Sequence, residues 1–159
     1  MSSSTCFDLE VPARPEYLSL IRSLVVEAAT TDPSLTRERL EDLKVAVSEA
    51  ATNAIEAHVR ACRDDSIQIR CTLTSDRIEV RITDHGSGFY PDQVEILPEP
   101  DDPARLDYER GLGLYLMRVL TDDIGIHSSP DGTEVRLVVR LPSGGFEAEP
   151  GADPAAVTE

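Results

Sequence analysis

The sequence predicts an α+β protein: a two-layer α/β sandwich in which helices cover one face of a mixed or antiparallel β-sheet. The predicted elements run strand, helix, helix, strand, strand, long loop, helix and then one or two strands. A length of 159 residues suits one domain with a hydrophobic core. With 40% apolar and 28% charged residues, the composition is that of a globular chain rather than a disordered one.

The first half of the chain predicts one strand and two helices. Residues 6–11 alternate weakly between apolar and polar side chains, which indicates a short strand. At 16–30, apolar residues recur every three or four positions, which predicts a helix that ends near Pro33. Thr36 suits the N-cap of a longer helix that runs to about Cys62. The inward positions of the two helices are Leu18, Ile21, Val25 and Ala28, followed by Leu40, Leu43, Val47, Ala51 and Ala54.

The second half predicts two strands, a loop, a helix and a last strand. Apolar and polar residues alternate at 66–74 and again at 77–84, with a tight turn between them. Residues 90–110 hold four prolines and seven acids with little periodicity, which indicates a functional or disordered loop. A short apolar helix is expected at 111–120, and a last strand at 132–141.

These elements predict one domain over residues 1–141. The tail, residues 142–159, is rich in Gly, Ala, Pro and acid, so we expect it to be disordered. The formal charge of the chain is −15, of which the loop at 90–110 contributes −5 and the tail −4. This acidity argues against binding to nucleic acid or to an anionic membrane. No stretch suits a membrane span or a signal peptide, so a cytoplasmic protein is expected.

Two short segments carry side chains suited to ligand binding. Glu49 and Asn53 lie four positions apart in the second predicted helix and therefore share a face, flanked by small alanines. A carboxylate can act as a base, and an amide oxygen can bind magnesium. Asp84 follows a strand and precedes Gly86 and Gly88, which let the backbone turn sharply against a ligand. Taken alone, the first segment fits an ordinary helix–solvent face better than a binding site, and the second fits an ordinary tight turn as well as a binding site.

A third segment, Arg-Gly-Leu-Gly-Leu at 110–114, is predicted to open a helix. Backbone amides at the start of a helix suit a phosphate group. The segment fits neither common nucleotide fingerprint. The dinucleotide motif requires glycine where Leu116 stands, and a P-loop requires a lysine, whereas the one lysine of the chain is Lys44. A fourth segment, Gly132-Thr133 at the start of the last strand, is a weak signal alone.

In this order the four segments resemble the ATP-binding domain of the GHKL superfamily, which has the Bergerat fold and includes gyrase, chaperone ATPases and histidine kinases. Residues 49–53 match its N box, 84–88 its G1 box, 110–114 its G2 box and 132–133 its last box. The resemblance covers almost all of the predicted domain. It implies that the loop at 90–110 is the ATP lid.

Within the superfamily, the chain is most similar to the anti-sigma-factor serine/threonine kinases of bacterial partner-switching systems. It carries no phosphoacceptor-histidine helix pair, and it has Glu49 where typical histidine kinases have Asn or Asp. Family members often have a histidine four residues after the box asparagine. This chain has Ala57 there, with His58 one position later. We therefore expect His58 to be a partly buried helix residue.

The resemblance implies a role for each candidate residue. Asp84 would bind the adenine amino group of ATP, with Gly86 and Gly88 letting base and sugar approach. Asn53 would bind magnesium, and Glu49 would accept the proton of a serine hydroxyl. The remaining ATP-binding positions would be the phosphate-cradling residues Gly111, Leu112, Gly113 and Leu114, with Arg110 near the γ-phosphate and Thr133 on the last strand.

The implied partners are a sigma factor and an anti-anti-sigma antagonist protein, of which a serine is phosphorylated to regulate transcription. Members of the family are commonly homodimers, so a homodimer is expected. Two alternatives remain at this point. One is a non-catalytic ATP-binding module that only sequesters the sigma factor. The other is a histidine-kinase-type catalytic domain that acts in trans.

Overall fold

The computed structural model describes residues 4–88 and 105–142, without the side chains of residues 105–111. The predicted tail beyond Pro142 and most of the predicted lid lie outside the described residues. In chain order, the elements are β1 (Thr5–Pro12), a 3₁₀ turn η1 (Pro15–Tyr17), α1 (Leu18–Ala29), α2 (Arg37–Arg60), β2 (Ser66–Leu73), β3 (Arg77–Asp84), α3 (Arg105–Leu120), β4 (Asp123–Ser129) and β5 (Gly132–Arg140).

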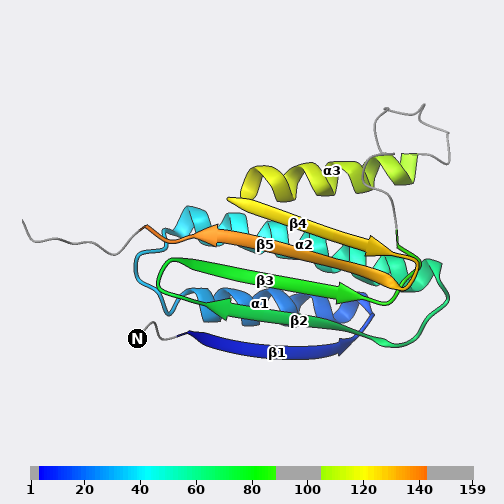
Figure 1. Cartoon of the computed structure of the whole chain (residues 1–159), viewed down its shortest axis with the longest axis horizontal. Coiled ribbons are helices and arrows are strands. Elements are labelled where there is room, and N and C mark those ends of the chain that lie inside the picture. The colour runs from blue at the N-terminus through cyan, green and yellow to red at the C-terminus, as the bar shows by residue number, and fades with distance from the viewer. Residues whose placement is uncertain (1–3, 89–104, 143–159) are drawn as a thin grey trace, which may run out of the picture.

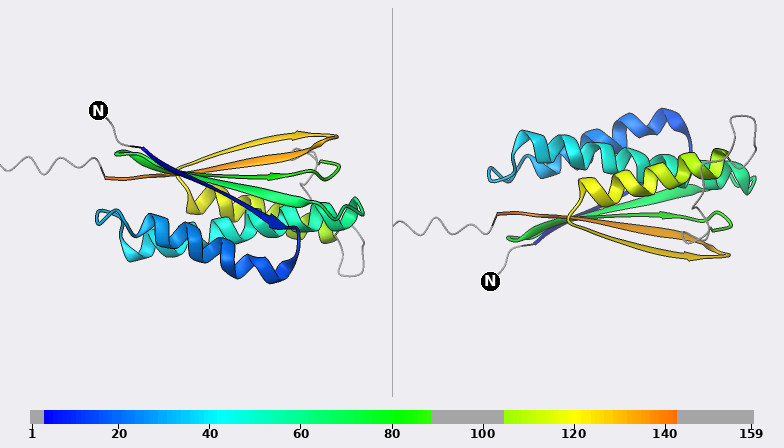
Figure 2. Two further views of the ribbon diagram at one scale, coloured as in Figure 1. Left: turned by 90° about the horizontal axis from the view of Figure 1, so that it is seen from below. Right: turned by 90° about the horizontal axis from the view of Figure 1, so that it is seen from above.

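The strands form one antiparallel sheet in the order β1-β2-β3-β5-β4. All three α-helices lie against the same face of this sheet, as the two side views in Figure 2 show. The two-layer α+β class is therefore confirmed, and the sheet is wholly antiparallel. Because β3 and β5 are central neighbours, Asp84 at the end of β3 pairs with Thr133 near the start of β5.

The core lies between the sheet and the helices. Strand residues alternate as predicted: in β2, Ile67 and Ile69 are buried while Gln68 and Arg70 face solvent. The helices bury a stripe that includes most of the predicted positions. The largest fully buried apolar side chains are Ile21, Leu43, Ile67, Ile69, Ile78, Ile82, Met117 and Leu137.

One predicted boundary in the second half is wrong. Helix α3 begins at Arg105 rather than at residue 111. The sequence does not indicate its first turns, because residues 105–110 combine two acids with two arginines and lack the apolar spacing that marks a helix. After this helix the sequence predicts one or two strands, and the structure has two. The sequence does not give bounds for β4, since only Ile124 and Ile126 are apolar in this short edge strand, which ends in polar residues. It pairs with β5 as a hairpin.

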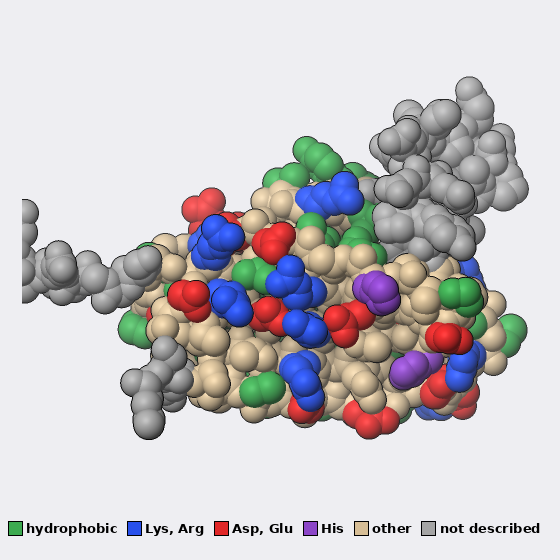
Figure 3. Space-filling view, in the orientation of Figure 1, with side chains coloured by type: hydrophobic (Ala, Val, Ile, Leu, Met, Phe, Trp, Pro, Cys, Tyr) green, Lys and Arg blue, Asp and Glu red, His purple; other side chains and the backbone are tan. Residues whose placement is uncertain are grey.

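The uncovered face of the sheet is charged but balanced. Its register places Arg70, Arg81 and Arg136 side by side across β2, β3 and β5, where like charges would repel one another. Blue and red side chains intermingle over this face in Figure 3. The nearest acidic partners are Asp8 at 2.6 Å from Arg70, Glu79 at 2.7 Å from Arg81, and Asp123 at 3.0 Å from Arg136.

The N-cap of α2 offers a test of the fold. The Thr36 hydroxyl accepts a hydrogen bond from the Arg39 backbone N–H at 3.2 Å. Thr36→Ala should therefore lower the free energy of unfolding by about 1 kcal/mol, measured by urea denaturation. Thr36→Ser keeps the hydroxyl and should retain most of that stability. Equal losses in the two variants would contradict a capping role.

Candidate functional site

A narrow cleft lies between the C-terminal half of α2 and the neighbouring ends of β3 and β5, which lie together in Figure 1. Its volume is about 10 Å³, which is room for roughly one water molecule. The cleft as it stands therefore cannot hold a nucleotide base. Its lining unites four of the predicted site residues, Asn53, Asp84, Gly88 and Thr133, with Ala50, Ala54, Ala57, Arg60, Ile82, Ser87 and Val135.

Asp84 is a buried carboxylate at the base of this cleft, with 6% of its surface exposed. Its Oδ1 accepts hydrogen bonds from the backbone N–H of Gly86 at 2.9 Å and of Thr133 at 3.3 Å. Both bonds end on the same oxygen, and within residues 4–88 and 112–142 no hydrogen bond to Oδ2 is found. Burial raises the pKa of Asp84, and the two backbone hydrogen bonds oppose that shift only in part.

The glycines of the turn after β3 are required by close contacts. A Cβ at Gly86 would stand 2.8 Å from Ala57 Cβ on α2, so only glycine lets the turn approach the helix this closely. Gly88 has a φ of +76°, and a Cβ there would collide with the carbonyl oxygen of Ser129. The turn is thus held between α2 on one side and the β4–β5 hairpin on the other.

The side chains of Glu49 and Asn53 lie against helix α3 at Gly113. A Cβ at Gly113 would stand 2.9 Å from Glu49 Oε2 and 3.7 Å from Asn53 Nδ2. Asn53 Nδ2 is buried without a hydrogen-bond partner. A buried, unpaired polar group costs about 1–3 kcal/mol and requires an explanation. These two side chains therefore form a polar cluster at the α3 end of the cleft, with Asn53 shared between cluster and cleft.

The expectation that residues 110–114 open a helix is wrong. Because α3 starts at Arg105, the amides of these residues lie beyond the first four, whose N–H groups are free in a helix. Leu114 is buried in the core, and Leu112 is exposed. Arg110 and Gly111 lie within α3, but their side chains are outside the described residues.

The sequence also left three residues of the last turns of α2 without a role. Ala57 packs against Gly86, Arg60 lines the cleft, and His58 is completely buried rather than partly buried as expected. The helical spacing from Asn53 could have indicated Ala57 and Arg60, which follow it by four and seven positions. Among residues 4–88 and 105–142, no group of three His, Cys, Asp or Glu side chains could hold a metal ion.

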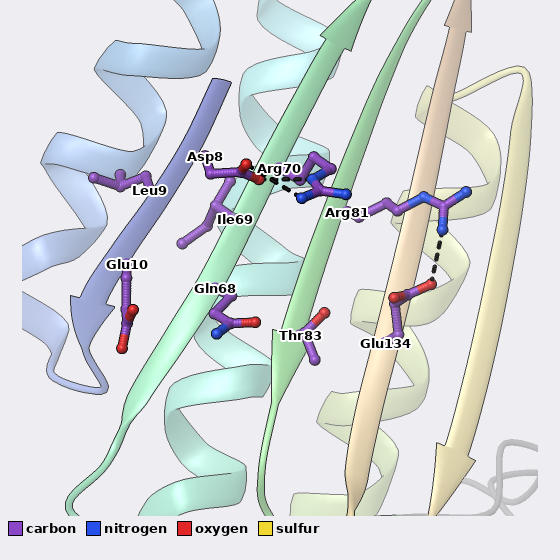
Figure 4. A pocket seen from close by; sticks show the side chains of 9 residues that line it. All are labelled: Asp8, Leu9, Glu10, Gln68, Ile69, Arg70, Arg81, Thr83 and Glu134. Carbon is purple, nitrogen blue, oxygen red and sulfur yellow. Dashed lines mark hydrogen bonds and ion pairs between the residues drawn. The ribbon is translucent and has the colours of Figure 1, made fainter. Parts of the chain in front are cut away.

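A larger hollow of about 580 Å³ lies on the opposite, uncovered face of the sheet. Figure 4 shows that Arg70 and Arg81, which line it, point toward acidic partners, Asp8 and Glu134. The hydrogen bond from Arg70 lowers the pKa of Asp8. With its arginines paired, this hollow offers no evident site for an anion, and the four predicted segments do not meet there.

Comparison with known proteins decides the family. The model of the histidine kinase-like ATPase domain matches residues 11–139. The serine-protein kinase RsbW of Bacillus subtilis is 37% identical over 124 residues, which cover 76% of this chain and 77% of that protein. RsbW of Listeria innocua is 36% identical over 122 residues, 75% of this chain and 77% of that protein.

This chain belongs to the RsbW family of histidine kinase-like ATPase domains. A crystal structure of the RsbU and RsbW domains of a Mycobacterium tuberculosis protein shares the fold of this RsbW-family domain, with a TM-score of 0.61 at 16% identity. The match covers 86% of this chain and 32% of the longer mycobacterial chain. Within the described part of the chain, no helix combines the length and the apolar character needed to span a membrane.

The raised pKa of Asp84 predicts a pH dependence of stability. Between its ordinary value of 3.8 and its raised folded value, the native state binds more protons than the unfolded state. The free energy of unfolding of the wild type should therefore fall, relative to that of Asp84→Asn, as pH rises above 3.8. Asparagine keeps an Oδ1 that can accept both backbone hydrogen bonds. Urea denaturation of both proteins from about pH 2.5 to about pH 7 measures the difference.

Asp76→Asn is the matched control for this experiment. Asp76 is exposed, and its hydrogen bond from Thr74 lowers the pKa of Asp76 instead of raising it. The wild type should therefore gain stability relative to Asp76→Asn as pH rises toward 3.8. The same sign in both variants would contradict burial as the cause of the Asp84 shift.

Proposed function

We propose that this chain is an ATP-dependent protein serine/threonine kinase that sequesters a sigma factor and phosphorylates a serine of an anti-anti-sigma antagonist. Relatives that share about three quarters of their length with it are serine-protein kinases. The main structural support for the proposal is the arrangement of three side chains around the cleft. A carboxylate, Glu49, and a buried, unpaired amide, Asn53, lie together at one end of a cleft whose other end is the carboxylate of Asp84.

The described residues fit MgATP in their chemistry. Asp84 accepts a hydrogen bond from the adenine amino group at its free Oδ2, and Gly86 and Gly88 keep side chains away from the base and sugar. Asn53 supplies an oxygen ligand to magnesium. Bound MgATP supplies the phosphoryl group, while the metal offsets the charge of the phosphates. The unpaired atom of Asn53 is Nδ2, an N–H donor, and a phosphate oxygen of the nucleotide would be its acceptor.

Glu49 is the proposed general base. It accepts the serine proton as the serine oxygen bonds to the γ-phosphorus and ADP leaves. Because phosphoryl transfer depends mainly on positioning and charge stabilisation, the remaining residues bind and orient. Small alanines around Glu49 and Asn53 let the serine-bearing segment approach α2 closely.

The first turns of α3 must move before nucleotide binds. The cleft has room for about one water, and the backbone amides of residues 111–114 are engaged within a helix. In the proposed ATP-bound state, residues 105–110 unwind. The amides of Gly111, Leu112, Gly113 and Leu114 then face the phosphates, with Arg110 near the γ-phosphate and Thr133 below the base. Residues 89–104 of the proposed lid lie outside the described structure.

The proposal also places a homodimer of this chain in the cytoplasm, without direct contact to nucleic acid or membrane. The presence of both Glu49 and Asn53 favours a catalytic protein over a module that only sequesters its partner. The serine-kinase names of the relatives favour serine as the acceptor over the histidine of a two-component system.

A transfer assay tests the function. With labelled ATP, magnesium and a candidate antagonist, the wild type should label a serine of the antagonist. Glu49→Ala should reduce transfer by about a hundredfold or more, because a positioned base contributes that much, while ATP binding persists. Glu41→Ala, on an exposed part of α2, is the control and should transfer normally. Wild type that binds ATP and sigma factor without labelling the antagonist would refute the kinase activity.

Gly113→Ala should impair phosphoryl transfer without lowering the free energy of unfolding. Alanine favours a helix over glycine by about 1 kcal/mol, so the free energy of unfolding should stay level or rise. Its methyl group would press on Glu49 Oε2, 2.9 Å away, and displace the proposed base. Transfer should fall about tenfold or more, since small misplacements of reacting groups are costly. Unchanged transfer in this variant would argue against Glu49 as the base.

A further inference from the structure

His58 is the one histidine that the sequence singled out and the proposed chemistry leaves unused. It lies in the last turn of α2, and none of its surface is exposed. Its Nε2 accepts a hydrogen bond from the backbone N–H of His85 at 2.8 Å. An accepting Nε2 carries no proton, so the neutral ring has its proton on Nδ1. Nδ1 lies 3.5 Å from Asp65 Oδ1, without hydrogen-bond geometry.

The donor of this bond, the backbone N–H of His85, lies within the turn at the end of the cleft. His85 lies between Asp84, whose Oδ2 faces the ligand in the proposed function, and Gly86, whose N–H is bonded to Asp84 Oδ1. Within this turn Asp84 binds the N–H of Gly86 and not that of His85. A backbone N–H that is removed from water needs a partner, and the imidazole of His58 provides it.

A second contact fixes the same segment to the same helix turn. Gly86 approaches α2 so closely that a Cβ there would stand 2.8 Å from Ala57 Cβ and 2.9 Å from the Ala57 carbonyl oxygen. Adjacent residues of α2, Ala57 and His58, therefore hold adjacent residues of the turn, one by packing and the other by a directed hydrogen bond. Packing alone limits how near the turn can come, whereas the hydrogen bond also fixes its rotation.

From these contacts we infer that His58 is the positioning residue of the base-binding turn, a role that rests on the proposed nucleotide binding. It acts through the His85 amide and does not touch the ligand. Asn53 and His58 lie on one helix, so this hydrogen bond also sets the distance between the residue proposed for magnesium and the Asp84 carboxylate. Loss of the acceptor lets the turn shift away from α2 and separates the two ends of the site.

Three substitutions of His58 separate the effect of its hydrogen-bond acceptor from the effect of its bulk. In His58→Gln, the side-chain oxygen can reach the position of Nε2 and accept the His85 N–H. His58→Met has similar bulk but no comparable acceptor. Should His58→Met fail to fold, His58→Asn replaces it, since its oxygen reaches only the position of Nδ1. Val25→Ala, in the core beneath α1, serves as a control that lowers stability far from the turn.

Two measurements on the whole chain test whether His58 positions the turn. NMR hydrogen exchange without nucleotide should show the His85 amide exchanging about tenfold faster in His58→Met than in wild type, and near the wild-type rate in His58→Gln. Calorimetry with MgATP should show about tenfold weaker binding in His58→Met, and binding within about threefold of wild type in His58→Gln. In transfer assays the loss should appear as a raised KM for ATP rather than a lowered kcat.

The outcomes separate the two proposals. If His58→Met weakens ATP binding no more than Val25→Ala does, or if His58→Gln restores neither measurement, His58 is only a core residue and the inference is wrong while the kinase proposal stands. If wild-type protein does not bind MgATP, the proposed function fails and the role of His58 fails with it. Faster exchange at His85 combined with weaker ATP binding, both restored by glutamine, supports the inference.

Discussion

The buried carboxylate of Asp84 holds together the end of β3, the turn that follows and the start of β5. Its Oδ1 bonds the N–H groups of Gly86 and Thr133, which belong to segments far apart in the sequence. A carboxylate this buried is costly unless it is well hydrogen-bonded, which the raised pKa of Asp84 reflects. One oxygen provides the structural bonds, and the other remains for a ligand. The arrangement therefore combines a structural tie with an available acceptor.

Close backbone contacts make this tie possible. The start of β5 has a glycine, Gly132, with a φ of +143°, and a Cβ there would collide with the carbonyl oxygen of Asp84. Gly86 lies close to α2, and Gly88 lies close to the β4–β5 hairpin, so a Cβ at either position would also collide with its neighbour. Three glycines thus let three elements converge on one carboxylate. This is a physical reason for the glycine pattern that holds whether or not a nucleotide is bound.

Much of this arrangement was predictable from the sequence because it depends on local patterns. Alternation located β2 and β3, and Thr36 located the start of α2. The antiparallel neighbours β3 and β5 then bring Asp84 and Thr133 together. His58 was not predictable in the same way, because the partner of its Nε2 is a backbone amide 27 positions away, and no side-chain pattern marks an amide. The predicted start of α3 is too late because residues 105–110 lack the apolar spacing that marks a helix in a sequence.

The two ends of the site differ in how firmly they are held. Around Asp84, the turn is fixed by hydrogen bonds to its own carboxylate and to His58, and by contact with Ala57. At the other end, Gly111 and Gly113 each weaken α3 by about 1 kcal/mol relative to alanine, just where it crosses Glu49. Segments that move on ligand binding are drawn from the less stable parts of a fold. We therefore expect the hydrogen-bonded turn at Asp84 to keep its conformation when nucleotide binds. In the proposed ATP-bound state the phosphate-binding end would form as α3 unwinds, which would place the energetic cost of nucleotide binding beside the proposed catalytic residue.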